Sequence, residues 1–275
     1  MKKNKWNVTA IVILTIATII YLAPLYWMIT GSFKIQSDTM KVPPEIFPEN
    51  PTLQNYHNLL FGGMPAFKWL FNSIFIASAI ALGGVLTSGM AGYGFAKKQF
   101  PGRQWLFWLM LITMTMPLQI RLVPLFVMVR NLGWSNTHLG VIFPYLAYPF
   151  GVFLVRQFAH TIPNDLLDAA KVDGASELGT FFKIVVPLLK PALAAVAIFA
   201  FVAGWNEYMW QLIVLSRNEM LTLPLGVARL VTSASGYDLG LAMAGATFAF
   251  LPMLLIFMLF QRHFVEGITM GSVKG

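Results

Sequence analysis

The residue sets that carry out enzymatic chemistry are missing from this 275-residue sequence. It has no cysteine, no GxxxxGK[ST] loop to hold nucleotide phosphates, no HExxH zinc motif and no GxSxG nucleophile motif. Its four histidines are scattered along the chain instead of being grouped at ligand spacing: His57, His138, His160 and His263. We therefore predict that the chain is not an enzyme and that it binds no metal or cofactor of its own.

Charged side chains are concentrated in one stretch of a sequence that is only 11% charged. Seven of them fall between positions 165 and 190: Asp165, Asp168, Lys171, Asp173, Glu177, Lys183 and Lys190. Pro163 and Asn164 mark a helix start, with Asn164 as the expected N-cap. Asp173-Gly174 indicates a sharp turn, and Ser176 is expected to cap a second helix that runs to Pro187. The pattern predicts a polar helix-turn-helix over residues 161–190.

The first helix of this pair is predicted to be amphipathic. At 100° per residue, the apolar and charged side chains separate onto opposite sides, with Val172 as the one exception. The apolar side holds Leu166, Leu167, Ala169 and Ala170, and the charged side holds Asp165, Asp168 and Lys171. Such a helix is expected to lie along a surface.

The composition shows what surrounds this stretch. With 57% hydrophobic residues and a mean hydropathy of +0.68, the chain holds more apolar side chains than a soluble core of this size buries. Long uncharged runs of helical length predict an all-α integral membrane protein with six transmembrane helices. The predicted spans are residues 8–32, 70–95, 104–121, 137–158, 191–213 and 239–261, and we predict one transmembrane domain over residues 1–275.

The positions of lysine and arginine predict the orientation. If both termini are cytoplasmic, 12 of the 19 basic residues lie on the cytoplasmic side, together with residues 161–190. Basic residues beside membrane spans also account for the net charge of +8, so no nucleic-acid partner is expected. Within residues 70–95, Gly84, Ser88 and Gly92 form a stripe at four-residue spacing. It is either a close-packing face or the ordinary glycine content of a membrane helix.

The charged stretch resembles the signature of binding-protein-dependent ABC importer permeases. That pattern is Glu-Ala-Ala, three residues, Gly, nine residues, Ile, any residue, Leu-Pro. At this spacing the chain has Asp168, Ala169, Ala170, Gly174, Ile184, Val186 and Pro187. Only Asp for Glu and Val for Leu depart from it. Residues 204–215 and 264–275 further resemble the carbohydrate branch, close to the smaller permease of maltose-type importers.

The resemblance implies a permease subunit in the bacterial cytoplasmic membrane that moves a sugar-like solute by alternating access. It implies four kinds of partner: a second homologous permease, two ATPase subunits that bind ATP and Mg, an external solute-binding protein and the lipid bilayer. The helix pair would dock on an ATPase through Asp168, Ala169, Ala170, Asp173, Gly174, Ile184 and Pro187. The C-terminal residues Gly271, Ser272, Val273, Lys274 and Gly275 would also contact the ATPases.

The sequence leaves three interpretations with alternatives: the path residues, the docking of the helix pair and the type of transporter. Trp205, Asn206, Glu207 and Tyr208 are predicted to face the translocation path, because polar groups in a span face the protein interior or water. The same residues also fit an aromatic belt at the outer interface. The helix pair could lie on lipid headgroups instead of docking. The alternative function is a self-sufficient secondary transporter, although repeated halves and intramembrane charges are not evident.

Overall fold

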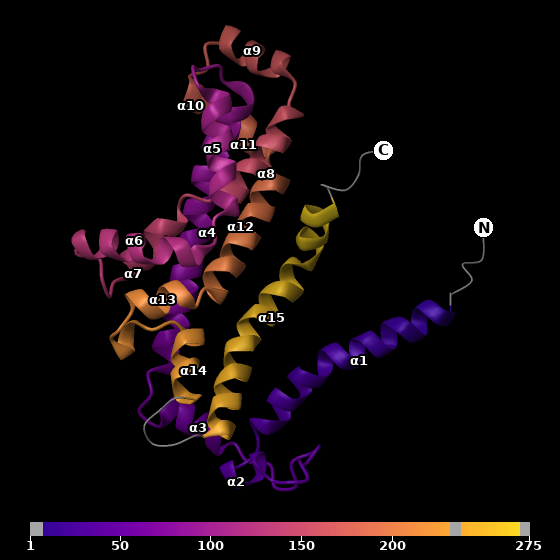
Figure 1. Ribbon diagram of the computed structural model, residues 1–275. Helices are drawn as coiled ribbons and strands as arrows, with labels where there is room; N and C mark the ends of the chain where they lie inside the picture. Colours follow the sequence, from indigo (N-terminus) through magenta and orange to yellow (C-terminus); the bar gives the residue numbers. More distant parts are fainter. Residues whose placement is uncertain (1–7, 232–237, 270–275) are drawn as a thin grey trace. The chain divides into compact units, whose positions relative to one another are not determined.

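The computed structural model describes residues 8–231 and 238–269, and this part of the chain is helical with no β-strand (Figure 1). The helices group into two compact units. The first unit comprises residues up to Phe67 together with Leu223–Pro252, and the second comprises Lys68–Thr222 and the residues from Met253 onward.

The first unit is built on α1 (Val8–Gly31), α2 (Gln36–Thr39), α3 (Gln54–Phe61), α14 (Leu223–Val231) and the first half of α15 (Leu239–Thr269). The end of α1 is tied to α3 by Asn55, whose amide donates to the carbonyls of Ser32 (2.9 Å) and Lys34 (2.8 Å). Apart from Gly31, α1 buries none of its residues in this chain. Its apolar side chains are therefore left for lipid or for another subunit.

The second unit contains the charged helix pair and the helices that carry it. Its elements are α4 (Ala66–Lys97), α5 (Arg103–Thr115), α6 (Leu118–Asn131), α7 (His138–Ile142), η1 (Phe143–Tyr145), α8 (Pro149–His160), α9 (Asn164–Val172), α10 (Glu177–Thr180), the π-helical η2 (Phe181–Val185), α11 (Val186–Leu188), α12 (Lys190–Asn206), α13 (Met209–Val214) and η3 (Asn218–Met220). Figure 1 shows α9 and α10 at one end of the helices α4, α5, α8 and α12.

A proline bends one of the predicted spans. α5 ends at Thr115 and α6 runs on at 105° to it, because Pro117 forces Met116 into an extended conformation. The stretch predicted as one span at 104–121 is thus a bent pair of helices. A second bend, of 81°, separates Glu177–Leu188 from Lys190–Asn206 at Leu189.

Four helical segments of the described chain are long and apolar enough to cross a membrane alone, and up to six are if each bent pair counts as one span. The four are Val8–Gly31, Ala66–Lys97, His138–His160 and Leu239–Gln261. The number of spans and the cytoplasmic position of both termini stay predictions. The range 191–213 holds α12 and α13 with a break at Glu207 and Tyr208 between them.

The stripe of small residues on α4 is a packing face. A Cβ on Gly92 would lie 2.7 Å from the Cβ of Val155 on α8. Ser88 is fully buried, and its hydroxyl donates to the carbonyl of Tyr148 at 3.3 Å. Gly84 faces Ala200 of α12. The close-packing interpretation is confirmed, because these small side chains let α8 and α12 approach the α4 backbone.

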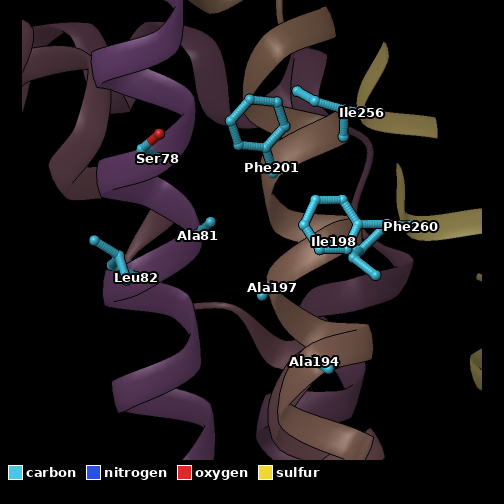
Figure 2. A pocket seen from close by; sticks show the side chains of 9 residues that line it. All are labelled: Ser78, Ala81, Leu82, Ala194, Ala197, Ile198, Phe201, Ile256 and Phe260. Atoms are coloured by element: carbon cyan, nitrogen blue, oxygen red, sulfur yellow. The ribbon is translucent and has the colours of Figure 1, made fainter. Parts of the chain in front are cut away.

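The second unit also contains an apolar cavity of about 440 Å³ between α4, α12 and the second half of α15. Figure 2 shows its lining side chains, among which the Ser78 hydroxyl is the one polar group. Alanines on α12, Ala194 and Ala197, leave the space that larger side chains would fill. A cavity with so few polar groups is unsuited to a polar solute.

Candidate functional site

The charged stretch forms the helix pair that the sequence predicts, with α9 as its first helix and α10 opening its second. The Ser176 hydroxyl accepts a hydrogen bond from the Gly179 amide at 3.1 Å, so the predicted cap of α10 is confirmed. The predicted cap of α9 is wrong by one position. Asn164 is the first helical residue, and its side-chain oxygen accepts a hydrogen bond from Lys97 at 2.9 Å instead.

The turn between the two helices depends on Gly174. Its φ is +75°, in the left-handed region, and a Cβ there would meet no atom within 4 Å. The Gly174 amide donates to the Lys171 carbonyl at 3.0 Å, and the Ala175 amide donates to the Ala170 carbonyl at 2.9 Å. This is a Schellman cap, which ends a helix with glycine because glycine adopts positive φ without strain.

The apolar side chains of α9 are not all buried. Leu167 and Ala170 are buried, whereas Leu166, Ala169 and Val172 are exposed. The predicted amphipathic helix is present, but only part of its apolar side is buried. The three exposed residues are spaced three apart and form a row. Val172, which the helical pattern leaves as an exception, is 88% exposed and belongs to this row. Exposed apolar side chains on a rigid helix are typical of an interaction surface.

Asp168 lies beside this row on the surface of α9. Its carboxylate is paired with Lys171 at 3.1 Å, and both side chains are more than half exposed. An exposed pair of this kind contributes about 0–1 kcal/mol to stability. Asp168 is thus not needed to hold the helix together, and its charge is accessible to a partner.

Two consecutive lysines at the end of α4 hold the helix pair in place. The Lys97 ammonium donates to the Ile162 carbonyl and to Asn164, at the start of α9. The Lys98 ammonium is paired with Glu177, at the start of α10. Sequence reasoning assigned both lysines only to the orientation of the membrane spans. Nothing in their sequence positions indicates partners 65 to 79 residues away.

The Lys98–Glu177 pair shifts the pKa of both groups. The hydrogen bond from Lys98, followed by its charge, lowers the pKa of the Glu177 carboxyl, although desolvation acts the other way. Partial burial works to lower the pKa of the Lys98 ammonium, but the hydrogen bond to Glu177 and the interactions with Tyr93 and Glu177 raise it overall. Both groups are therefore held in their charged forms at neutral pH.

A buried apolar cluster joins the helix pair to the membrane helices. It contains Tyr93 of α4, Val155 of α8, Leu167 of α9, Phe181 of η2 and Val196 of α12, with further members on these elements and between them. The rings of Tyr93 and Phe181 lie 5.7 Å apart. α9 therefore shares a close-packed core with α4, α8 and α12.

The remaining residues of the predicted docking motif lie in the second helix. Ile184 is partly buried in η2, and Pro187 is exposed in α11. The helix continues past Pro187 to Leu188, one residue beyond the predicted end. A proline has no N–H to donate and crowds the preceding turn. The π-helical turn η2 occupies the turn before Pro187, which is the turn that the proline ring crowds.

The four predicted path residues lie where α12 breaks, and they face different ways. Trp205 is buried and stacks on Phe201 at 6.0 Å, while Asn206 and Tyr208 are exposed. The Glu207 carboxylate accepts a hydrogen bond from the Trp210 amide at 2.9 Å and so caps α13. Their role in the path stays a prediction. The predicted tail contacts, Gly271 to Gly275, lie outside the described residues.

The family comparison decides the class of protein. Residues 83–270 match the family described as "Binding-protein-dependent transport system inner membrane component". The chain belongs to this family. The match begins in α4 and includes the helix pair, the break in α12 and most of α15.

Curated relatives of this permease cover nearly its whole length. It is 40% identical over 260 residues to the arabinooligosaccharides transport system permease protein AraQ of Bacillus subtilis (strain 168), with 94% of this chain and 92% of the relative covered. It is 31% identical over 270 residues to the sn-glycerol-3-phosphate transport system permease protein UgpE of Brucella abortus (strain 2308), with 96% of each covered.

The fold of the permease is also found among solved structures. A chain of a bacterial ABC transporter involved in the import of the acidic polysaccharide alginate superimposes with a TM-score of 0.79. The two share 20% sequence identity, and the superposition covers 94% of this chain and 96% of the other.

Proposed function

We propose that this importer permease carries a sugar or sugar-like solute across the bacterial cytoplasmic membrane by alternating access. The solute class follows from its relatives, which are named for arabino-oligosaccharides and for sn-glycerol 3-phosphate. The chain works beside a second homologous permease, two ATPase subunits and an external solute-binding protein. ATP and Mg bind to the ATPases, because this chain has no phosphate-binding loop.

The observation that carries the proposal is the helix pair with its exposed row. Leu166, Ala169 and Val172 present apolar surface, and Asp168 next to them presents a charge. The two faces of α9 thus have separate roles: the buried face, with Leu167, is fixed to the membrane helices, and the exposed face docks on an ATPase. A docking surface of this composition combines desolvated apolar contact with a charge that sets orientation.

Coupling then requires no chemistry in this chain. When the ATPases close on ATP, the docked α9 moves with them, and the buried cluster passes the displacement to α4, α8 and α12. Lys97 and Lys98 tie both helices of the pair to the same end of α4, so that the pair moves as one piece. The membrane helices rearrange because a rigid element is displaced at their end.

The test is uptake by the complete importer in proteoliposomes. The chain is co-purified with its permease partner and ATPases and supplied with its external binding protein. A radiolabelled arabino-oligosaccharide is the first solute and sn-glycerol 3-phosphate the second. Uptake of one of them is expected to require both ATP and the binding protein. Uptake by the purified chain alone, driven by an ion gradient without ATP, would show a secondary transporter and refute the proposal.

A further inference from the structure

A second cavity in this chain is lined by a charged group and by hydroxyl groups as well as by apolar side chains. It has a volume of about 300 Å³ and lies in the second unit, where α5 gives way to α6 and where η1, α8 and α12 meet. Its lining includes one cation, two phenols, one further aromatic ring and one small residue that leaves room: Arg121, Tyr145, Tyr148, Phe150 and Ala203. Its size is at the lower end of the range of small-molecule pockets.

The Tyr145 hydroxyl is the most informative group in this cavity. It is buried and makes no hydrogen bond of ordinary geometry with the described residues. The Glu207 carboxylate lies beside it and interacts with it by its charge and by a weak hydrogen bond, and Arg121 acts on it by its charge. Buried hydroxyls in folded proteins are nearly always bonded. A hydroxyl at a cavity wall whose internal contact is this weak can bond a ligand that enters the cavity.

The aromatic side chains are held in fixed positions. Phe150 packs edge-on against Phe199 of α12 at 5.6 Å and against Tyr148 at 6.0 Å. The backbone carbonyl of Tyr148 accepts the hydrogen bond from buried Ser88. The rings are therefore braced by α4 and α12, and they offer apolar faces that do not have to be ordered when a ligand enters.

We propose that this cavity is a binding site for one sugar-sized, polyhydroxylated unit of the transported solute. The aromatic rings contact the apolar face of the sugar, and Arg121 and Tyr145 exchange hydrogen bonds with its hydroxyl groups. The inference rests on the proposed function and adds that this permease chain itself holds solute during transport. Glu207 would act on the solute through Tyr145, whose hydroxyl its carboxylate adjoins.

The geometry of α6 supplies a matched control. Arg121 is on the first turns of α6 and lines the cavity, while Arg130 is in the last turn of the same helix and does not. Tyr21 on α1 is 79% exposed and lies in the first unit, so its hydroxyl serves as the control for Tyr145. Each cavity variant is thus paired with the same substitution elsewhere.

The experiment measures solute moved per ATP hydrolysed by the complete importer in proteoliposomes, with a loaded binding protein and a radiolabelled arabino-oligosaccharide. Arg121→Gln is expected to lower this ratio about 10-fold and Tyr145→Phe about 3-fold, as the loss of a charged and of a neutral hydrogen bond requires. ATP hydrolysis stimulated by the binding protein stays at the wild-type rate. A folding or assembly defect would instead lower hydrolysis and uptake together.

A third variant tests the space itself. Ala203→Leu places a larger side chain into the cavity from α12 and is expected to abolish uptake while stimulated hydrolysis continues. Arg130→Gln and Tyr21→Phe are expected to keep the wild-type ratio. A wild-type ratio in both Arg121→Gln and Tyr145→Phe would overturn the inference while leaving the importer assignment intact. A wild-type complex without ATP-driven uptake would overturn the proposed function first, and this inference with it.

Discussion

Replacing Gly174 by valine tests whether the turn between α9 and α10 sets the coupling surface. The residue adopts a φ of +75°, which a β-branched residue takes up only with strain. A Cβ at this position meets no atom within 4 Å, so the substitution introduces no steric overlap with the rest of the chain. The whole effect comes from the backbone of the turn.

The expected magnitude follows from that strain, which is about 1–3 kcal/mol for an unfavourable backbone conformation. The turn can relieve it by giving up the two hydrogen bonds of its cap, from the amides of Gly174 and Ala175. α9 then loses its fixed direction relative to α10. If only the native arrangement docks, the apparent affinity for the ATPases falls by roughly 5- to 150-fold.

Gly133 provides the matched control for this substitution. It follows α6 as Gly174 follows α9, has a φ of +72° and also has no atom within 4 Å of its Cβ position. Its cap has the same two hydrogen bonds, from the Gly133 amide to Arg130 and from the Trp134 amide to Val129. Gly133→Val therefore carries the same backbone strain at a turn outside the helix pair.

The assay is co-purification of the ATPase subunits with the permease, followed by ATP-driven uptake. Gly174→Val is expected to lose ATPase subunits or uptake while still pairing with the second permease, and Gly133→Val is expected to keep both. Gly174→Asn should lie between wild type and valine, because asparagine tolerates the left-handed region. Full ATPase association and transport in Gly174→Val would refute the docking role of this turn. Equal losses in the two valine variants would show that backbone strain at any such turn causes the effect, and not the position of this turn.

Four further predictions follow from individual contacts. Asp168→Lys is expected to leave the melting temperature unchanged, because its ion pair is exposed, but to lose ATPase association in co-purification; Asp168→Glu should retain association, and equal behaviour of the two variants would contradict a charge contact. Gly92→Ala is expected to destabilise the protein by about 1–3 kcal/mol, because the added methyl group overlaps α8. Gly94→Ala has open space around it and is expected to stabilise the helix by about 0.5–1 kcal/mol. Thermal unfolding in detergent measures both effects. Glu207→Gln keeps an oxygen that can cap α13 and is expected to lower the uptake rate at normal assembly; wild-type rate and solute preference would argue against a place at the path. Removing residues 269–275 is expected to change ATPase stimulation, and unchanged stimulation at unchanged assembly would remove the tail from the coupling mechanism.

Local patterns in the sequence were sufficient to predict the helix pair. Asp173-Gly174 and Ser176 act through the backbone groups of their own turn, so their roles can be inferred without knowledge of the rest of the chain. The apolar composition likewise predicts an all-helical membrane protein, because a lipid environment requires every backbone group to bond within its own segment. The stripe at Gly84, Ser88 and Gly92 also indicated a packing face, although it did not identify the helix that packs there.

Contacts between segments that are distant in sequence could be identified only from the tertiary structure. The helical pattern placed Leu166 and Leu167 on one side of α9, but only Leu167 is buried, since the position of α4 and α8 decides how much of an amphipathic face is covered. From the sequence, Lys97 and Lys98 could be interpreted only as charges that flank a membrane span. The structure shows that they contact Asn164 and Glu177. The cavity at Tyr145 lies where Pro117 bends α5 into α6 and α12 comes to its end at Asn206. Such pairings depend on the relative placement of helices, which the periodicity of a single helix does not encode.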